Sequence, residues 1–143
     1  MPMLVDQIRP IVLAIISHNG KILVSPGFDQ VKKTNFYRLL GGGIDFGEDS
    51  LTALQREIQE ELGVEIKKAI LLGVKENIFQ YNGNSGHEIC FVYQCTLDSE
   101  EIYQKDKIQV IDKPGHFAIW LEINEQNISK IYPDGFAKYF ETR

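Results

Sequence analysis

Three glutamates, Glu57, Glu60 and Glu61, fall within five residues of one predicted helix. An α-helix turns by about 100° per residue, so the three carboxylates project from one narrow arc. Glu57 and Glu61 form an i, i+4 pair of like charge, which destabilises a bare helix. Runs of glutamate are usually a solvated helix face, but here a glycine run, residues 41–43, lies just upstream and allows close approach to the backbone. A cation bound by the carboxylates is the natural explanation of this pattern.

The helix that carries these glutamates is predicted over residues 50–62. Asp49 is a suitable N-cap, and Gly63 follows the last helical residue where a left-handed conformation commonly ends a helix. An apolar stripe of leucine and isoleucine runs beside the acidic stripe, so one face of the helix is expected to pack on a core. Arg56 precedes Glu60 by four residues and is positioned to hold that carboxylate in one orientation.

The segment from Gly42 to Val64 resembles the signature of the Nudix hydrolases, which include the MutT-like proteins. That signature reads Gly, any five residues, Glu, any seven, Arg-Glu, aliphatic, any, Glu-Glu, any, Gly, aliphatic. One nearby position departs from the family, because leucines stand where proline often precedes the glycines; this alters the stiffness of the turn and removes no ligand. The residues that fill the specified positions are Gly42, Glu48, Arg56, Glu57, Ile58, Glu60, Glu61, Gly63 and Val64.

The resemblance implies metal-dependent hydrolysis of a pyrophosphate bond in a nucleoside diphosphate linked to another moiety. Carboxylate oxygens favour hard cations, so Mg²⁺ or Mn²⁺ is the expected cofactor, with Glu57, Glu60 and Glu61 as metal ligands. The predicted catalytic residues are Glu60, Arg56 and Glu48. Glu60 is either a ligand or the general base held by Arg56, and Glu48 is expected to orient the ligands or a water.

Substrate contacts are expected from Gly42, Phe46 and Tyr81. Gly42 offers backbone contacts, and Phe46 could stack on a base, although packing explains it equally well. Tyr81 follows the motif at a distance similar to that of a tyrosine in the dinucleoside-polyphosphate hydrolases of the family. Glu88 is a further candidate for the general base. A nucleoside triphosphate, a sugar nucleotide and a non-nucleotide diphosphate all remain open as substrates.

Length and charge limit the remaining possibilities. The 143 residues suit one domain, 1–143, with a substantial core. A net charge of −5 argues against binding along duplex nucleic acid, but not against a small nucleoside diphosphate derivative, because a bound metal reverses the local charge. No apolar run has the roughly eighteen residues of a membrane span, and no secretion signal is visible, so we expect a cytoplasmic protein. A homodimer is left open.

Most of the remaining chain has the pattern of strands. An α+β domain follows, and the resemblance implies a mixed β-sheet sandwiched between α-helices. The glycine run is predicted to be a turn directly before the helix, and Cys90 and Cys95 are predicted to face opposite sides of one strand as buried thiols. The expected strands cover residues 10–17, 21–25, 35–40, 66–75, 76–81, 87–96 and 117–122, and a C-terminal helix is expected over 136–141.

Two classes of function fit the pattern. The first is a metal-dependent pyrophosphohydrolase. The second is a catalytically silent nucleotide-sensing module that keeps the fold and binds its ligand without turnover. The intact set of carboxylates favours the enzyme. An isomerase of allylic diphosphates, which would use the same fold, lacks support because no catalytic cysteine context accompanies the motif.

Overall fold

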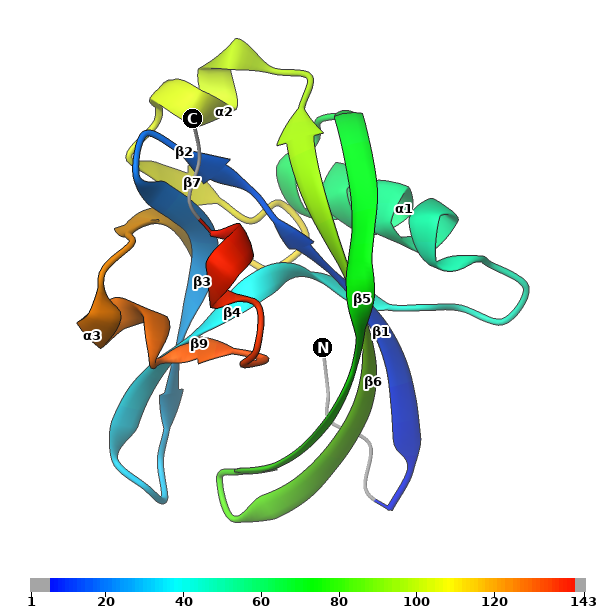
Figure 1. Ribbon diagram of the computed structural model, residues 1–143, viewed down its shortest axis with the longest axis vertical. Coiled ribbons are helices and arrows are strands. Elements are labelled where there is room, and N and C mark those ends of the chain that lie inside the picture. Colours follow the sequence, from blue (N-terminus) through cyan, green and yellow to red (C-terminus); the bar gives the residue numbers. More distant parts are fainter. Residues whose placement is uncertain (1–5, 141–143) are drawn as a thin grey trace.

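The computed structural model describes residues 6–140 and contains one long helix packed against a mixed β-sheet (Figure 1). The elements in chain order are β1 (Ile8–Ile15), β2 (Ser17–His18), β3 (Lys21–Asp29), β4 (Thr34–Gly43), α1 (Ser50–Leu62), β5 (Ile66–Tyr81), β6 (Asn84–Leu97), α2 (Glu100–Gln104), β7 (Lys107–Gln109), β8 (Phe117–Glu122), α3 (Glu125–Ile128), β9 (Ile131–Tyr132) and the 3₁₀ turn η1 (Ala137–Tyr139).

The strands follow the order β5-β6-β1-β4-β3-β8-β7, with β2 paired to β3 and β9 paired to β4. β1 lies parallel to β6, and β9 lies parallel to β4; the other pairs are antiparallel. β1 is a central strand with neighbours on both edges, which explains its nearly continuous apolar sequence. The tight connection into β3 uses Asn19 and Gly20 at φ angles of 51° and 76°, as their sequence predicts.

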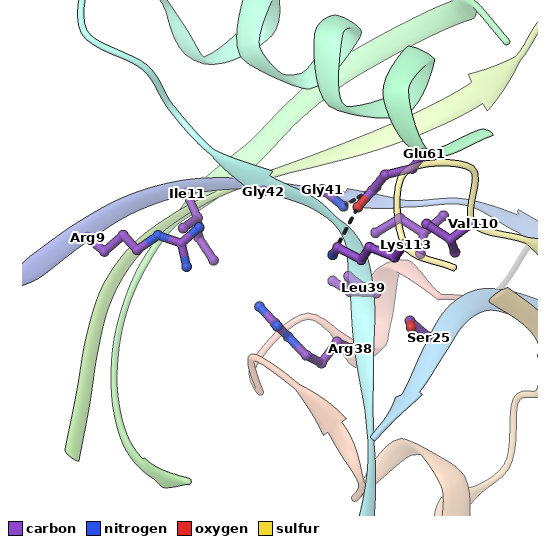
Figure 2. A pocket seen from close by; sticks show the side chains of 11 residues that line it. Arg9, Ile11, Ser25, Arg38, Leu39, Gly41, Gly42, Glu61, Val110 and Lys113 are labelled. Carbon is purple, nitrogen blue, oxygen red and sulfur yellow. Dashed lines mark hydrogen bonds and ion pairs between the residues drawn. The ribbon is translucent and has the colours of Figure 1, made fainter. Parts of the chain in front are cut away.

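The glycine run lies at the end of β4 and not in a turn, which corrects the prediction from the sequence. Gly41, Gly42 and Gly43 pair in antiparallel register with β1 (Figure 2). Gly41 has a φ of 143°, and a Cβ atom there would overlap the carbonyl oxygen of Val12 on β1. Gly41 is therefore needed for close contact between the two strands. The chain turns later, around Gly47, whose φ is 90°.

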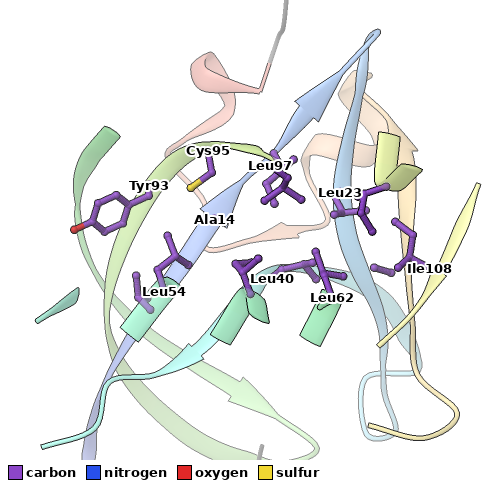
Figure 3. Close-up of a cluster of buried hydrophobic side chains, with 14 of the residues drawn as sticks. Ala14, Leu23, Leu40, Leu54, Leu62, Tyr93, Cys95, Leu97 and Ile108 are labelled. Atoms are coloured by element: carbon purple, nitrogen blue, oxygen red, sulfur yellow. The ribbon is translucent and has the colours of Figure 1, made fainter. Parts of the chain in front are cut away.

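Two apolar clusters occupy the two sides of the sheet. Alternate residues of β1 point to each side: Val12 and Ala14 contact the cluster under α1, and Ile11 and Leu13 contact the cluster under the C-terminal segment. Figure 3 shows the first cluster, in which leucines of α1 meet side chains from β1, β3, β4 and β6. The fold is the predicted mixed sheet sandwiched between helical segments. The two cysteines belong to different clusters, so their predicted opposite orientation is confirmed.

Two other predictions need correction, and two short helices were missed. The two strands expected over residues 66–75 and 76–81 form one strand, β5, with an irregularity near Gly73. The C-terminal helix is shortened to the single turn η1, and Glu141 lies outside the described residues. Pairing of β9 with β4 fixes the chain only a few residues earlier, and burial of Phe136 and Phe140 then leaves too short a segment for a regular helix. The short helices α2 and α3 were not predicted, although Ser99 and Asn124 cap them.

Candidate active site

Helix α1 begins and ends at the predicted residues. The Asp49 carboxylate accepts a hydrogen bond from the Thr52 amide at 2.8 Å, and Gly63 adopts a left-handed conformation with a φ of 69°. Leu54 and Ile58 are fully buried, whereas Leu51 is partly exposed at the start of the helix. Burial of this apolar stripe turns the adjacent acidic stripe toward the glycine end of β4.

Glu57 lies against the backbone of β4 with only 5% of its surface exposed. Its carboxylate is so close to Gly42 that a Cβ atom at that position would overlap both oxygens. Burial raises the pKa of Glu57, and the guanidinium of Arg56, whose Nη1 lies 3.5 Å from Glu57 Oε2, offsets only part of this rise. The glycine at position 42 is therefore required by the carboxylate on α1.

Glu61 is buried one helical turn further along, at 4% exposure. Its Oε1 accepts a hydrogen bond of 3.2 Å from the Gly41 amide, and Lys113 Nζ lies 3.7 Å from Oε2 (Figure 2). Burial raises the pKa of Glu61 to about 7, while Lys113 and the Gly41 amide act in the opposite direction. Two carboxylates that resist ionisation thus lie side by side next to the glycines of β4.

Arg56 ties the helix to the preceding loop and to β4. Its Nε and Nη2 donate to the two oxygens of Glu48 at 2.8 and 2.9 Å, and Nη2 also donates to the Gly43 carbonyl at 2.9 Å. Its Nη1 donates to Glu60 Oε1 at 3.2 Å. The hydrogen bonds from Arg56 to Glu48, together with one from the Asp45 amide, lower the pKa of the Glu48 carboxyl to about 2. The network fixes Glu48 and Glu60 relative to the buried pair of glutamates.

The structure divides the three predicted metal ligands into two groups. Glu57 and Glu61 face β4, whereas the Glu60 side chain is 47% exposed and contacts Arg56. Within residues 6–140, no three side chains of histidine, cysteine, aspartate or glutamate converge into a formed metal centre. The donor set nevertheless fits a hard cation, because the two buried carboxylates make only long ion pairs, of 3.5 Å to Arg56 and 3.7 Å to Lys113, and oxygen is the ligand such cations prefer.

A cavity of about 740 Å³ opens beside this site, between the hairpin of β3 and β4 and the hairpin of β5 and β6. Tyr81 lines it and meets the Phe36 ring edge-on, with centroids 5.6 Å apart, and Phe36 meets Tyr132 in the same way at 6.2 Å. Glu88, the alternative general base, also lines the cavity and is buried. Phe46 is fully exposed on the loop before α1 and lines neither this cavity nor the smaller one described below.

The tips of the two hairpins are joined across one end of the cavity. Asp29, buried at the end of β3, accepts hydrogen bonds from the amides of Val31 and Lys32 at 2.9 and 2.8 Å, and from the Asn82 amide at 3.1 Å. The Gln30 amide in turn donates to Asn82 Oδ1 at 2.8 Å. The hydrogen bonds, that of Lys32 first, lower the pKa of Asp29. We call this set of contacts the hairpin bridge.

Sequence reasoning missed three cations beside the carboxylates. Arg9, Arg38 and Lys113 line a smaller cavity of about 50 Å³ together with the glycines of β4 and Glu61 (Figure 2). They come from β1, from β4 and from the loop before β8, and no spacing within the sequence connects them. A usable signal was present at Arg9, because a charged residue near the start of an otherwise apolar strand is buried when neighbouring strands cover that strand.

Comparison with known proteins identifies the class of this fold and site. The MutT NUDIX hydrolase from Burkholderia pseudomallei has a similar structure, with a TM-score of 0.61 and 28% identity, covering 82% of this chain and 85% of that one. The fold is also that of the mutator MutT protein from Bacillus halodurans, at a TM-score of 0.60 and 18% identity, with coverage of 94% and 80%. Among curated proteins, the RNA pyrophosphohydrolase of Pelagibacter ubique (strain HTCC1062) is 25% identical over 130 residues, which are 85% of this chain and 79% of that protein.

The sequence profile of the NUDIX domain matches residues 7–137, so this chain belongs to the NUDIX family. It is a pyrophosphohydrolase of the Nudix type, as the motif predicted. Nudix hydrolases act on nucleotide-derived substrates and generally use divalent metal ions. None of the helices in the described part of the chain is long and apolar enough to cross a membrane.

Proposed function

We propose that this chain uses a divalent cation, Mg²⁺ or Mn²⁺, to hydrolyse the pyrophosphate bond of a nucleoside diphosphate linked to another moiety. One observation carries the proposal: the buried carboxylates of Glu57 and Glu61 lie beside Gly41 and Gly42. The small cavity that Glu61 lines shares Arg38 and Lys113 with a cavity large enough for a nucleotide. When bound, such a cation offsets the charge of phosphate oxygens and lowers the pKa of a coordinated water.

Glu57 and Glu61 are the principal metal ligands in this proposal, because their burial disfavours the charged form unless a cation lies close. Glu60 serves as a third ligand or as the general base. Arg56 occupies Oε1 of Glu60, so Oε2 is the oxygen that would take a proton from the attacking water. Arg56 and Glu48 act as positioning residues, since they hold the loop, the helix and β4 in one arrangement.

The larger cavity holds the rest of the substrate. Its volume of about 740 Å³ falls in the usual range for ligand sites, roughly 300–1,000 Å³. Tyr81 and Phe36 provide aromatic surface for a nucleobase, and the backbone at Gly42 lies where the phosphates would meet the carboxylates. Because Phe46 is exposed and away from both cavities, base stacking on Phe46 is not part of the proposal.

The test is a substrate panel assayed with Mg²⁺, Mn²⁺ and EDTA. The panel contains sugar nucleotides, dinucleoside polyphosphates, nucleoside triphosphates and RNA with a 5′ triphosphate, the last because a relative is named as an RNA pyrophosphohydrolase. We expect release of a nucleoside monophosphate or inorganic phosphate only when a divalent cation is present. Absence of turnover across the panel with both cations would contradict the proposal.

Three variants then separate the roles of the glutamates. Glu61→Gln is expected to lower kcat about 100-fold or more and to weaken Mg²⁺ binding measured by calorimetry. Glu60→Gln is expected to lower kcat as strongly; retained Mg²⁺ affinity would identify a base, and lost affinity a ligand. Glu65→Gln, an exposed glutamate just beyond α1, is the matched control and should behave as wild type. Wild-type turnover by both site variants would remove the catalytic assignment.

Two further features of the protein are proposed with it. We place the protein in the cytoplasm, and the support is that Cys90 and Cys95 are free, buried thiols, as expected in a reducing compartment. A homodimer is a hypothesis that light scattering during size-exclusion chromatography would decide.

A further inference from the structure

Arg9 is a buried cation without adequate partners. Its side chain is only 11% exposed, and its Nη2 has no hydrogen-bond partner among the described residues. The nearest carboxylate oxygen, Oε2 of Glu88, lies 3.7 Å from Nη1, which is too long for a hydrogen bond. Buried polar groups in folded proteins are nearly always hydrogen-bonded, and an unsatisfied charged donor is especially costly. The position of Arg9 therefore indicates a missing anionic partner.

A second arginine shares the same cavity. Arg38 projects from β4 toward Arg9, and Lys113 lies between them and Glu61 (Figure 2). Within residues 6–140, Arg38 makes neither an ion pair nor a side-chain hydrogen bond. The two guanidinium groups repel each other, and burial together with this repulsion lowers the pKa of Arg9. Ion pairing accounts for Arg9 only in part, because Glu88, at 3.7 Å, is the single acid in contact with it among the described residues.

We propose that Arg9 and Arg38 form an anion site that binds a phosphate group of the substrate directly, on the side of the cleft opposite α1. The proposal rests on the proposed function and adds to it the residues that select for phosphate. Guanidinium groups suit this role, because their planar N–H donors bind phosphate oxygens in pairs. The bound phosphate would satisfy Nη2 of Arg9 and relieve the repulsion between the arginines.

The placement also restricts the substrate. The anion site and the Glu61 carboxylate of α1 line the same small cavity, so a phosphate at the arginines is adjacent to one at Glu61. The arrangement therefore suits a substrate with at least two consecutive phosphates, one held by arginine and one reached through the cation. Glu88 acts as the counter-ion of Arg9 when no substrate is bound, which gives this buried acid a role other than general base.

Calorimetric titration with inorganic pyrophosphate in EDTA tests the anion site without turnover. Arg38→Gln replaces an exposed side chain and should fold normally, whereas Arg9→Gln changes a buried one and needs a thermal melt as a check. We expect measurable binding by wild type and a dissociation constant about tenfold or more higher in each variant, as lost charge-assisted hydrogen bonds predict. Arg38→Lys should recover only part of the affinity.

Lys67→Gln is the charge-matched control, because Lys67 is exposed on β5 and lines neither cavity. Its pyrophosphate affinity should equal that of wild type. Pyrophosphate affinity unchanged in folded Arg9→Gln and Arg38→Gln proteins, or no binding by wild type, would overturn the anion site even if the enzyme hydrolyses nucleotides. Conversely, loss of pyrophosphate binding in these variants, in a protein that turns over no substrate in the panel, would support the anion site and reject the proposed reaction.

Discussion

The pKa of Glu61 predicts how the stability of the metal-free protein changes with pH. Burial raises this pKa to about 7 from an ordinary value of 4.5. Between these values the folded protein holds a proton on Glu61 that the unfolded chain has released. The stabilisation is therefore complete below the unfolded-state pKa and is lost as pH rises through the folded-state pKa. A shift of this size corresponds to about 3 kcal/mol of unfolding free energy, and no solvent discount applies because the side chain is almost fully buried.

Glu61→Gln isolates this contribution. Glutamine keeps the shape and an oxygen acceptor for the Gly41 amide, but it does not titrate. Glu57, whose pKa is also raised by burial, contributes in the same direction and remains in the variant, so the difference between the two proteins reports Glu61 together with its charge coupling to Glu57. We expect wild type to lose about 2.5 kcal/mol more than the variant between pH 5 and pH 8, because a small part of the stabilisation is already lost at pH 5.

The assay is urea unfolding in EDTA at several pH values, followed by the fluorescence of Trp120, the single tryptophan of the chain. Two-state analysis gives the unfolding free energy at each pH. Equal pH dependence of wild type and Glu61→Gln would refute the reasoning. Repeating the series with Mg²⁺ adds a second check, because a cation that binds only the folded state should restore stability to wild type at pH 8 and much less to the variant.

Three further predictions follow from individual contacts. Arg56→Lys should lower kcat at least about tenfold and reduce stability by about 1–3 kcal/mol, since lysine cannot replace the paired bonds to Glu48; a wild-type kcat and melting temperature would contradict this. Gly42→Ala should keep the fold, seen by circular dichroism, yet weaken Mg²⁺ binding, because the new methyl displaces the Glu57 carboxylate; an unchanged calorimetric Kd would count against it. Asp29→Ala should speed amide hydrogen exchange at both hairpin tips and leave α1 unaffected, whereas unaltered exchange at the tips would mean that the hairpin bridge does not restrain them.

The parts of the structure that are specified by residues close together in the sequence were predictable. Asp49, Gly63 and the apolar stripe define α1 from within a short segment, and its predicted ends match the structure. The hairpin turn at Asn19 and the strand β8 are likewise specified by residues within a short segment of sequence. Each of these signals lies inside the element it specifies, so no knowledge of the tertiary fold was needed.

Features that depend on contacts between distant segments were not predictable. Gly41 suits a turn equally well until β1 is known to lie against it, because the constraint comes from the carbonyl of Val12. Arg9 and Arg38 line one cavity only because β1 and β4 lie side by side, and nothing in the spacing of the sequence signals that pairing. Phe46 sits within the motif, yet the loop turns it to solvent. Sequence therefore identified the carboxylates, and the sheet was needed to identify the groups around them.

The parallel pairing of β1 with β6 has a consequence for how the chain reaches this structure. Residues 8–15 find their partner in residues 87–94, so β1 stays without that neighbour until more than half of the chain has been synthesised. Its apolar run, buried on both faces in the final sheet, lacks that cover throughout the interval and is therefore prone to aggregate. Non-local pairing of this kind also slows folding. The hydrolase should therefore refold slowly from urea, and its yield on expression should depend on chaperones that shield the first strand.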